Sequence, residues 1–289
     1  MRCLARAALL FVLVMAPASA LALPPVWVVR DQDSVITLFG SVHLLPEGVA
    51  WRPPALDRAL ASADDVWFEA PMDQAGQSAA TQAALAHAFL PDGQTLLPML
   101  SPAGRQRLAK AAKTIGVPVE QFDKLQPWYA ELLISGAMYQ AVGAKASDGV
   151  EQSLWGAVPA SAARHAFETP QQQVGFFADA PLKDQLASLE ETLKDLGDAK
   201  KDFELLLKAW LGADLGTLDR EVVKPLRKAS PALYARLVDQ RNARWTDAIA
   251  GRLHGSGHTV IVVGMGHLIG SGGVPALLRA RGFTVEGPR

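Results

Sequence analysis

One stretch near the C-terminus decides the fold, and it reads Thr259-Val260-Ile261-Val262-Val263-Gly264-Met265-Gly266-His267. The continuous apolar run at its start is typical of a strand that is buried on both faces of a sheet. Gly264 follows directly, and a glycine at a strand exit lets the backbone bend sharply. His267 is therefore expected just past the sheet edge. A helix is predicted from Val274 to Arg281, and a last short strand from Phe283 to Glu286.

The N-terminal part of the chain repeats this order of features. Apolar runs at 26–29 and 35–39 flank a turn cluster, a pattern that predicts a hairpin. Gly40-Ser41-Val42-His43 follows the second strand, as the C-terminal Gly-x-x-His segment follows its own. A helix is expected at about 55–62, and Val66-Trp67-Phe68 is read as a third strand that ends in Glu69.

The middle of the chain has a different character, because its pattern is mostly helical from about Gln77 to Arg252. Apolar residues recur at helical spacing between Leu182 and Leu211, and Gly197 is expected to divide that stretch into two helices. We therefore predict an α/β fold. Its mixed central sheet is built from both chain ends, with a large helical insertion at roughly 77–252.

The N-terminus has the pattern of a secretory signal peptide. Arg2 and Arg6 precede an apolar run from Ala7 to Met15, and small residues follow at Ala18-Ser19-Ala20. We predict that residues 1–22 are removed and that residues 23–289 form a single exported domain, in the periplasm or outside the cell. The apolar run is shorter than the ~20 residues that a bilayer span needs, so no stable membrane anchor is expected.

Composition narrows the chemistry of the exported part. Cys3 is the only cysteine and lies in the predicted signal peptide. Any metal in the mature protein would therefore be bound by histidine and carboxylate side chains. The chain has 28 basic and 29 acidic side chains, and no basic stripe indicates a nucleic-acid partner.

Three side chains are expected to meet at one edge of the sheet. His43, His267 and Glu69 each follow an apolar strand. In open α/β sheets, ligands bind beyond the carboxyl ends of the strands. Two histidines and a carboxylate form a plausible ligand set for a divalent metal ion.

Further candidates have alternative explanations within the fold. Glu151 is a second candidate carboxylate, and it is also suited to the first turn of a helix, where an acid interacts well with the helix dipole. Glu168 directly precedes a helix expected to begin at Thr169-Pro170. Arg241 lies in a long helical pattern, and it bears on function only if that helix packs over the sheet edge.

Taken in order along the chain, these motifs resemble the TraB/GumN family, whose animal relatives are the Tiki proteins. The resemblance rests on the two Gly-x-x-His segments, Trp67-Phe68-Glu69, Gly149-Val150-Glu151, Phe167-Glu168-Thr169-Pro170-Gln171-Gln172-Gln173 and Arg241-Asn242. It implies an α/β fold shared distantly with erythromycin esterases, and the divalent-metal-dependent peptidase activity known for the Tiki branch. It also implies central roles for His43, Glu69 and His267, with Arg241 lining the site.

Our first hypothesis is a metal-dependent hydrolase that acts on an exported peptide or protein. His43, His267 and Glu69 would hold Zn, Mn or Co, and the ion would activate a bound water. A glutamate would take the proton of that water, and Arg241 would stabilise the oxyanion. One alternative is a metal-independent, esterase-like hydrolase in which a histidine activates water. Another is a protein that binds and sequesters a peptide or a metal without turnover.

Overall fold

The computed structural model describes residues 23–288, so the predicted signal peptide at 1–22 lies outside the described residues. A six-stranded sheet has the order β6-β4-β7-β2-β1-β8. Its strands are β1 (Val26–Arg30), β2 (Ser34–Ser41), β4 (Asp65–Phe68), β6 (Ala163–Ala166), β7 (Gly257–Gly264) and β8 (Val285–Glu286). A two-stranded sheet pairs β3 (Leu45–Pro46) with β5 (Ala144–Lys145).

The two chain ends meet at the centre of the large sheet. β2 and β7 run parallel over their whole length, from Ser34 opposite Gly257 to Ser41 opposite Gly264. β4 flanks β7 on the other side, also parallel. β1 forms the expected hairpin with β2, and β8 closes the sheet antiparallel to β1. The predicted α/β fold, with a mixed sheet built from both chain ends, is confirmed.

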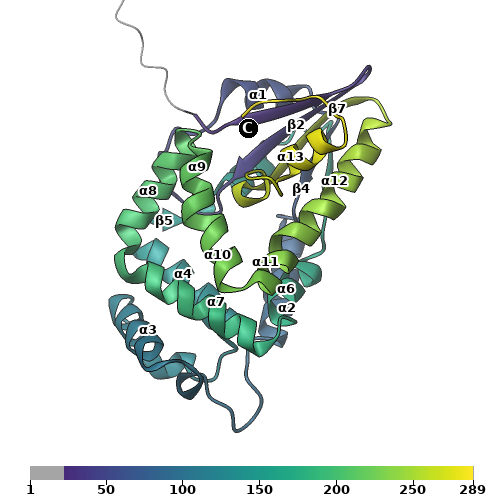
Figure 1. Cartoon of the computed structure of the whole chain (residues 1–289). Helices are drawn as coiled ribbons and strands as arrows, with labels where there is room; N and C mark the ends of the chain where they lie inside the picture. The colour runs from purple at the N-terminus through teal and green to yellow at the C-terminus, as the bar shows by residue number, and fades with distance from the viewer. Residues whose placement is uncertain (1–22, 289) are drawn as a thin grey trace, which may run out of the picture.

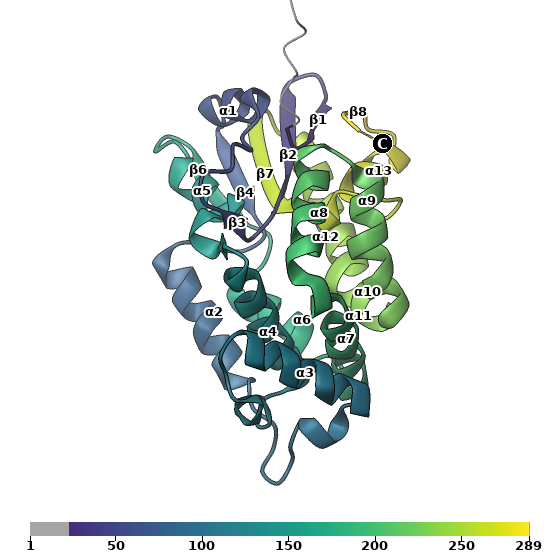
Figure 2. The same ribbon diagram turned by 90° about the vertical axis from the view of Figure 1, so that its left-hand side faces the viewer.

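The helices lie mostly in the middle of the chain. They are α1 (Pro54–Ala61), α2 (Gln74–Ala86), α3 (Pro102–Thr114), α4 (Pro127–Ala141), α5 (Val150–Ala157), α6 (Pro170–Ala178), α7 (Leu182–Asp195), α8 (Ala199–Leu211), α9 (Leu215–Leu218), α10 (Lys224–Ala229), α11 (Pro231–Tyr234), α12 (Gln240–Leu253) and α13 (Val274–Ala280). In Figures 1 and 2 the sheet lies at the top, with α2, α3, α4 and α7 below it. α7 and α8 are separated by a short 3₁₀ turn that contains Gly197, where the sequence predicted a break.

Two strands lie inside the stretch that was expected to be helical, β5 in the two-stranded sheet and β6 in the large one. β6 has the sequence Ala-Arg-His-Ala, which carries none of the β-branched residues that mark a strand. It forms because β4 presents an open edge, and the two strands pair in parallel. The pairing continues beyond both strands, since the amide of Glu168 donates to the carbonyl of Glu69 at 2.9 Å. β6 therefore places Glu168 next to Glu69.

Two apolar cores stabilise the structure. The larger one surrounds the sheet, and its biggest fully buried side chains include Trp27, Phe39 and Trp210. The second lies within the helical part and includes Leu108, Ile134 and Leu189.

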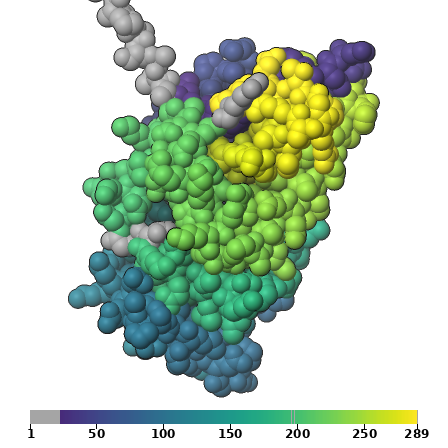
Figure 3. Space-filling model, viewed as in Figure 1, coloured from purple at the N-terminus to yellow at the C-terminus, as the bar shows by residue number. Residues whose placement is uncertain are grey.

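Figure 3 shows a hollow in one face of the molecule beside the green surface of α8. Within residues 23–288, no helix is both long and apolar enough to cross a membrane.

Trp210 joins the helical middle to the end of β2. Its ring packs against Phe39 and Trp51, and its indole N–H donates to the carbonyl of Gly40 at 2.9 Å. We expect Trp210→Phe to lower the free energy of unfolding by about 1–3 kcal/mol, because the buried carbonyl loses its donor. Urea denaturation measures this loss. Leu85→Ala, an exposed position on α2, should change stability by less than about 0.5 kcal/mol, and equal effects of the two substitutions would contradict the prediction.

Candidate active site

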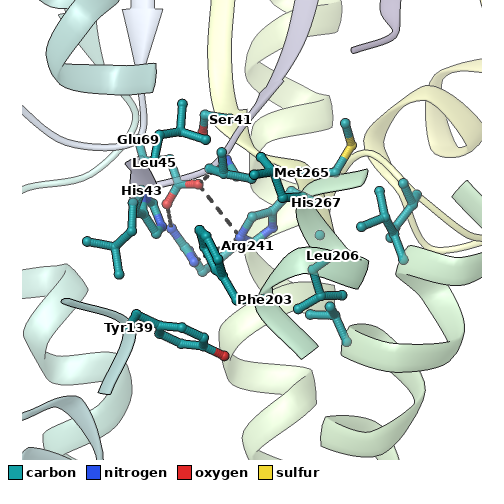
Figure 4. A pocket seen from close by; sticks show the side chains of 18 residues that line it. Ser41, His43, Leu45, Glu69, Tyr139, Phe203, Leu206, Arg241, Met265 and His267 are labelled. Atoms are coloured by element: carbon teal, nitrogen blue, oxygen red, sulfur yellow. Dashed lines mark hydrogen bonds and ion pairs between the residues drawn. The ribbon is translucent and has the colours of Figure 1, made fainter. Parts of the chain in front are cut away.

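Polar side chains lie at the carboxyl ends of four parallel strands, along the same edge of the sheet. Glu69 follows β4, Glu168 lies just beyond β6, and His267 lies just beyond β7. Ser41 ends β2, and His43 comes two residues later. A cavity of about 400 Å³ opens at this edge, and His43, Glu69 and His267 line it. Figure 4 shows these side chains gathered beneath the strand ends.

Glu69 is held from three sides. Its Oε1 accepts the amide hydrogen of Gly264 at 2.6 Å, which joins β4 to the end of β7. Its Oε2 accepts from Arg241 Nη2 at 2.5 Å and from Gln173 Nε2 at 3.2 Å. Burial alone would raise the pKa of Glu69, but the charges of His267, in its protonated form, and of Arg241 outweigh it and lower that pKa to about 2. Glu69 is therefore a carboxylate at neutral pH and is unsuited to accept a proton there.

Arg241 uses every N–H bond of its guanidinium group. Nε and Nη2 donate to the two oxygens of Glu168, both at 2.8 Å, and Nη2 also donates to Glu69. Nη1 donates to the carbonyl of Leu237 at 3.1 Å and lies 3.0 Å from His267 Nε2. A guanidinium group has five N–H bonds, so none is left for an oxyanion in this arrangement. Arg241 acts on the site through its charge and through the residues it positions.

The helix that carries Arg241 is irregular immediately before it. A π-helical segment, Ala235–Asp239, precedes α12 and contains Leu237, the carbonyl partner of Arg241. Such segments occur frequently at functional sites. The guanidinium lies over the ring of Trp245 at 4.7 Å and over that of Phe176 at 5.1 Å. α12 thus packs over the sheet edge, which is the condition under which Arg241 was expected to bear on function.

His267 is a buried, neutral histidine. Its Nδ1 lies 2.6 Å from the side-chain oxygen of Asn242, which can only accept, so Nδ1 carries the proton. Its Nε2 lone pair then accepts from Arg241. Burial lowers the pKa of His267 to about 4, against the attraction of Glu69. Both ring nitrogens of His267 are therefore engaged with protein partners.

His43 has the opposite environment. Its side chain is 73 % exposed, and its Nδ1 lies 2.7 Å from Oε1 of the buried Glu151. The same oxygen accepts from the hydroxyl of Ser41 at 2.5 Å. Attraction to Glu151 raises the pKa of His43 to about 9, although the protein that surrounds the ring in the cavity partly desolvates it and acts in the other direction. Within residues 23–288, Nε2 of His43 has no hydrogen-bond partner, and the ring lines the cavity.

A glycine allows Glu151 to reach His43. The amide of Val150, at the start of α5, donates to the carbonyl of Val42 at 3.1 Å. A Cβ atom on Gly149 would lie only 2.2 Å from the carbonyl oxygen of His43. Only glycine permits this close approach of the two backbones, because a methyl group there would force them apart.

All six side chains predicted from the sequence converge on this edge. His43, Glu69, Arg241 and His267 line the cavity, while Glu151 and Glu168 are buried behind His43 and Arg241. The predictions missed three further polar partners, namely Ser41, Gln173 and Asn242. Each lies inside a motif that carried the family resemblance, and that proximity was the one available signal.

The donor chemistry of the site does not fit a divalent ion as the side chains are arranged. In the described part of the chain, no group of three or more histidine, cysteine or carboxylate side chains is placed to hold a metal. An ion about 2.0–2.1 Å from His267 Nε2 would need the lone pair that Arg241 occupies, and it would lie against the guanidinium charge. The metal expected from the sequence stays a prediction.

Comparison with known proteins places the chain among relatives of similar length. The model of the family described as TraB/PrgY/gumN matches residues 25–287. A protein of Escherichia coli (strain K12) described as "Uncharacterized protein YbaP" is 26% identical over 246 residues, which cover 84% of this chain and 87% of that protein. The protein of the same description from Shigella flexneri matches to the same extent. No solved structure matches the chain.

The protonation of His43 can be tested without a substrate. We expect the ring protons of His43 to titrate well above the ordinary pKa of 6.5 in an NMR pH series, because Glu151 stabilises the imidazolium. Glu151→Gln should move that titration to lower pH. Glu47→Gln removes an exposed carboxylate that pairs with Lys145 and should leave it unchanged. An ordinary titration in the wild-type protein would refute the ion pair.

The buried ion cluster should dominate the acid sensitivity of the fold. We expect Arg241→Met to lower the free energy of unfolding by about 3–5 kcal/mol at pH 7, because two buried carboxylates lose their counter-ion. Arg244→Met removes an arginine that is 52 % exposed and 3.8 Å from Glu168, and it should cost less than about 1 kcal/mol. Denaturant unfolding of both variants measures the difference.

The sign of the pH dependence follows from the lowered pKa of Glu69. The wild-type protein should lose stability as the pH falls from about 4.5 towards 2, since the unfolded chain takes up the proton first. That acid-dependent loss should shrink in Arg241→Met. If this variant lost as much stability between pH 4.5 and 2 as the wild type, the buried ion cluster would not be the cause of the acid sensitivity.

Proposed function

Because the chain belongs to the TraB/PrgY/gumN family, we propose that it is a hydrolase in which His43 acts as the general base on a water molecule. The observation that carries the proposal is the ring of His43, which lines the cavity and whose Nδ1 is held by buried Glu151, while Nε2 has no hydrogen-bond partner among the described residues. A base oriented by a third group is the arrangement that activates nucleophiles in many hydrolases. Ser41 fixes Glu151 from the other side.

The proposed reaction is hydrolysis of an amide or an ester. Nε2 of neutral His43 removes a proton from water, and the oxygen of that water attacks the carbonyl carbon. Glu151 stabilises the resulting imidazolium, which then gives its proton to the leaving nitrogen or oxygen as the carbonyl–leaving-group bond breaks. Arg241 and Glu69 form the neighbouring polar wall of the cavity, and their charges determine the electrostatic field there.

The substrate class follows from the predicted signal peptide. A chain exported to the periplasm or beyond would meet exported peptides and proteins, and we propose these as the substrates. The cavity volume of about 400 Å³ is near the lower end of the range for small-molecule pockets. A short extended segment of a substrate would fit such a space.

The test is incubation of the mature protein with a peptide library, followed by mass spectrometry. We expect His43→Asn to lower kcat/KM by about 10²–10⁴-fold, which is the usual contribution of a general base. The variant should stay folded but melt at a lower temperature than the wild type, because asparagine keeps an N–H donor for buried Glu151 but lacks the positive charge. His165→Asn changes an exposed histidine on β6 whose ring contacts that of Trp67, and it should leave activity unchanged.

The pH profile separates this role of His43 from that of an acid. A base with a raised pKa works only when deprotonated, so kcat/KM should rise with pH towards about 9. Glu151→Gln should move this limb to lower pH. A rate that falls over the same range would mean that the imidazolium is the active form.

Two outcomes would replace the proposed mechanism. Activity that disappears on exhaustive chelation and returns with Zn, Mn or Co would favour the metal-dependent reaction, with His43, Glu69 and His267 as ligands after Arg241 moves. Peptides that co-purify intact and are never cleaved would indicate a sequestering protein.

A further inference from the structure

The second wall of the cavity is apolar and comes from the helical middle of the chain. One face of α8 presents Phe203, Leu206, Leu207 and Trp210 at helical spacing. Trp210 is fully buried against the end of β2. The other three side chains are only partly buried, because they line the cavity.

Neighbouring helices extend this wall. Phe203 contacts the ring of Tyr139 from α4, with the ring centres 5.6 Å apart. Leu218 from α9 and Val222 from the π-helical segment Asp219–Val223 also line the cavity, and Val222 is 44% exposed. In Figure 4, Tyr139, Phe203 and Leu206 lie on the helical side of the cavity, below the polar group at the strand ends.

This division of the cavity has a chemical meaning. The walls formed by α8, α9 and the π-helical segment contribute no charged side chain to it. A charged group placed there would lose its hydration without gaining a partner. An apolar group placed there would remove both its own surface and that of the leucines from water.

We infer that the cavity selects substrates carrying an uncharged apolar group of leucine to phenylalanine size next to the carbonyl that is attacked. The inference rests on the proposed function and names the substrate class of the same site. The carbonyl group lies at the polar wall near His43, and the apolar group lies against Phe203, Leu206 and Leu207. The shared chemistry is found in peptides with an apolar residue and in esters of apolar acids.

The size of the preference can be stated in advance. Each buried methylene strengthens binding by about fourfold. A leucyl side chain has three more carbon atoms than an alanyl one. We therefore expect kcat/KM to rise at least tenfold from N-acetyl-alanine to N-acetyl-leucine p-nitroanilide. N-acetyl-glutamate and N-acetyl-lysine p-nitroanilides should be no better than the alanine compound.

A matched series of p-nitrophenyl esters with the same acyl groups identifies the source of the apolar group. A preference seen with both series assigns the wall to the acyl side group itself. Turnover confined to the anilides indicates a peptide substrate, and turnover confined to the esters indicates an ester. Equal rates for alanyl and leucyl compounds in either active series, or a preference for a charged one, would overturn the inference.

Variants connect the preference to the wall. Leu206→Asn should reduce the leucine-to-alanine ratio of kcat/KM to about one. Leu132→Asn, an equal change at a 56% exposed position of α4, should retain the wild-type ratio. Thermal melts of both variants show whether they are folded. Leu206→Phe provides a second test, because the larger side chain fills part of the cavity. This variant should favour alanyl over leucyl compounds.

A binding measurement separates this inference from the proposed hydrolysis. Calorimetry on the His43→Asn protein compares N-acetyl-leucine amide with N-acetyl-alanine amide, without any turnover. Tighter binding of the leucine compound, together with no cleavage by the wild-type protein, would retain the apolar wall and refute the hydrolase. Cleavage without any leucine preference in rate or binding would retain the hydrolase and refute the apolar wall as the basis of selectivity.

Discussion

The guanidinium group of Arg241 is the interaction on which the rest of the site depends. Its five N–H bonds reach Glu69 after β4, Glu168 after β6, His267 after β7 and the carbonyl of Leu237 in its own helix. Three strand ends and one helix are thereby tied to a single buried cation. Neither carboxylate would tolerate burial alone, because an isolated buried charge is far more costly than a paired one. The cluster therefore fixes both the geometry of the sheet edge and its charge.

The two Gly-x-x-His segments have similar sequences but give histidines of opposite character. His267 is buried between Asn242 and Arg241, and its environment keeps it neutral. His43 faces the cavity, and the buried Glu151 holds a proton on it. Two residues of one type are thus driven apart in pKa by their surroundings, a pattern typical of sites that divide acid and base roles. The near-symmetry of the chain ends supplies the positions, and the helical middle supplies the difference.

The cavity lies where two kinds of structure meet. The sheet contributes polar groups at its carboxyl edge, as open α/β sheets generally do. The helical middle contributes the apolar wall of α8 and the π-helical segment. Trp210 joins the two halves through Gly40, so the wall that would select a substrate is bonded directly to the strand that leads to His43. A change in the helical part can therefore affect the polar site without touching a polar residue.

The sequence by itself determined the α/β fold, the pairing of the two chain ends and the six side chains that meet at the sheet edge. Apolar strands that end in polar residues carry that information locally, as at Phe68-Glu69. It did not reveal β6, because that strand lacks β-branched residues and exists only through the edge of β4. It also did not show that every N–H of the Arg241 guanidinium is bonded to a protein partner, or that Asn242 fixes the tautomer of His267. Those facts depend on distances between residues far apart in the chain, and only the tertiary structure sets them.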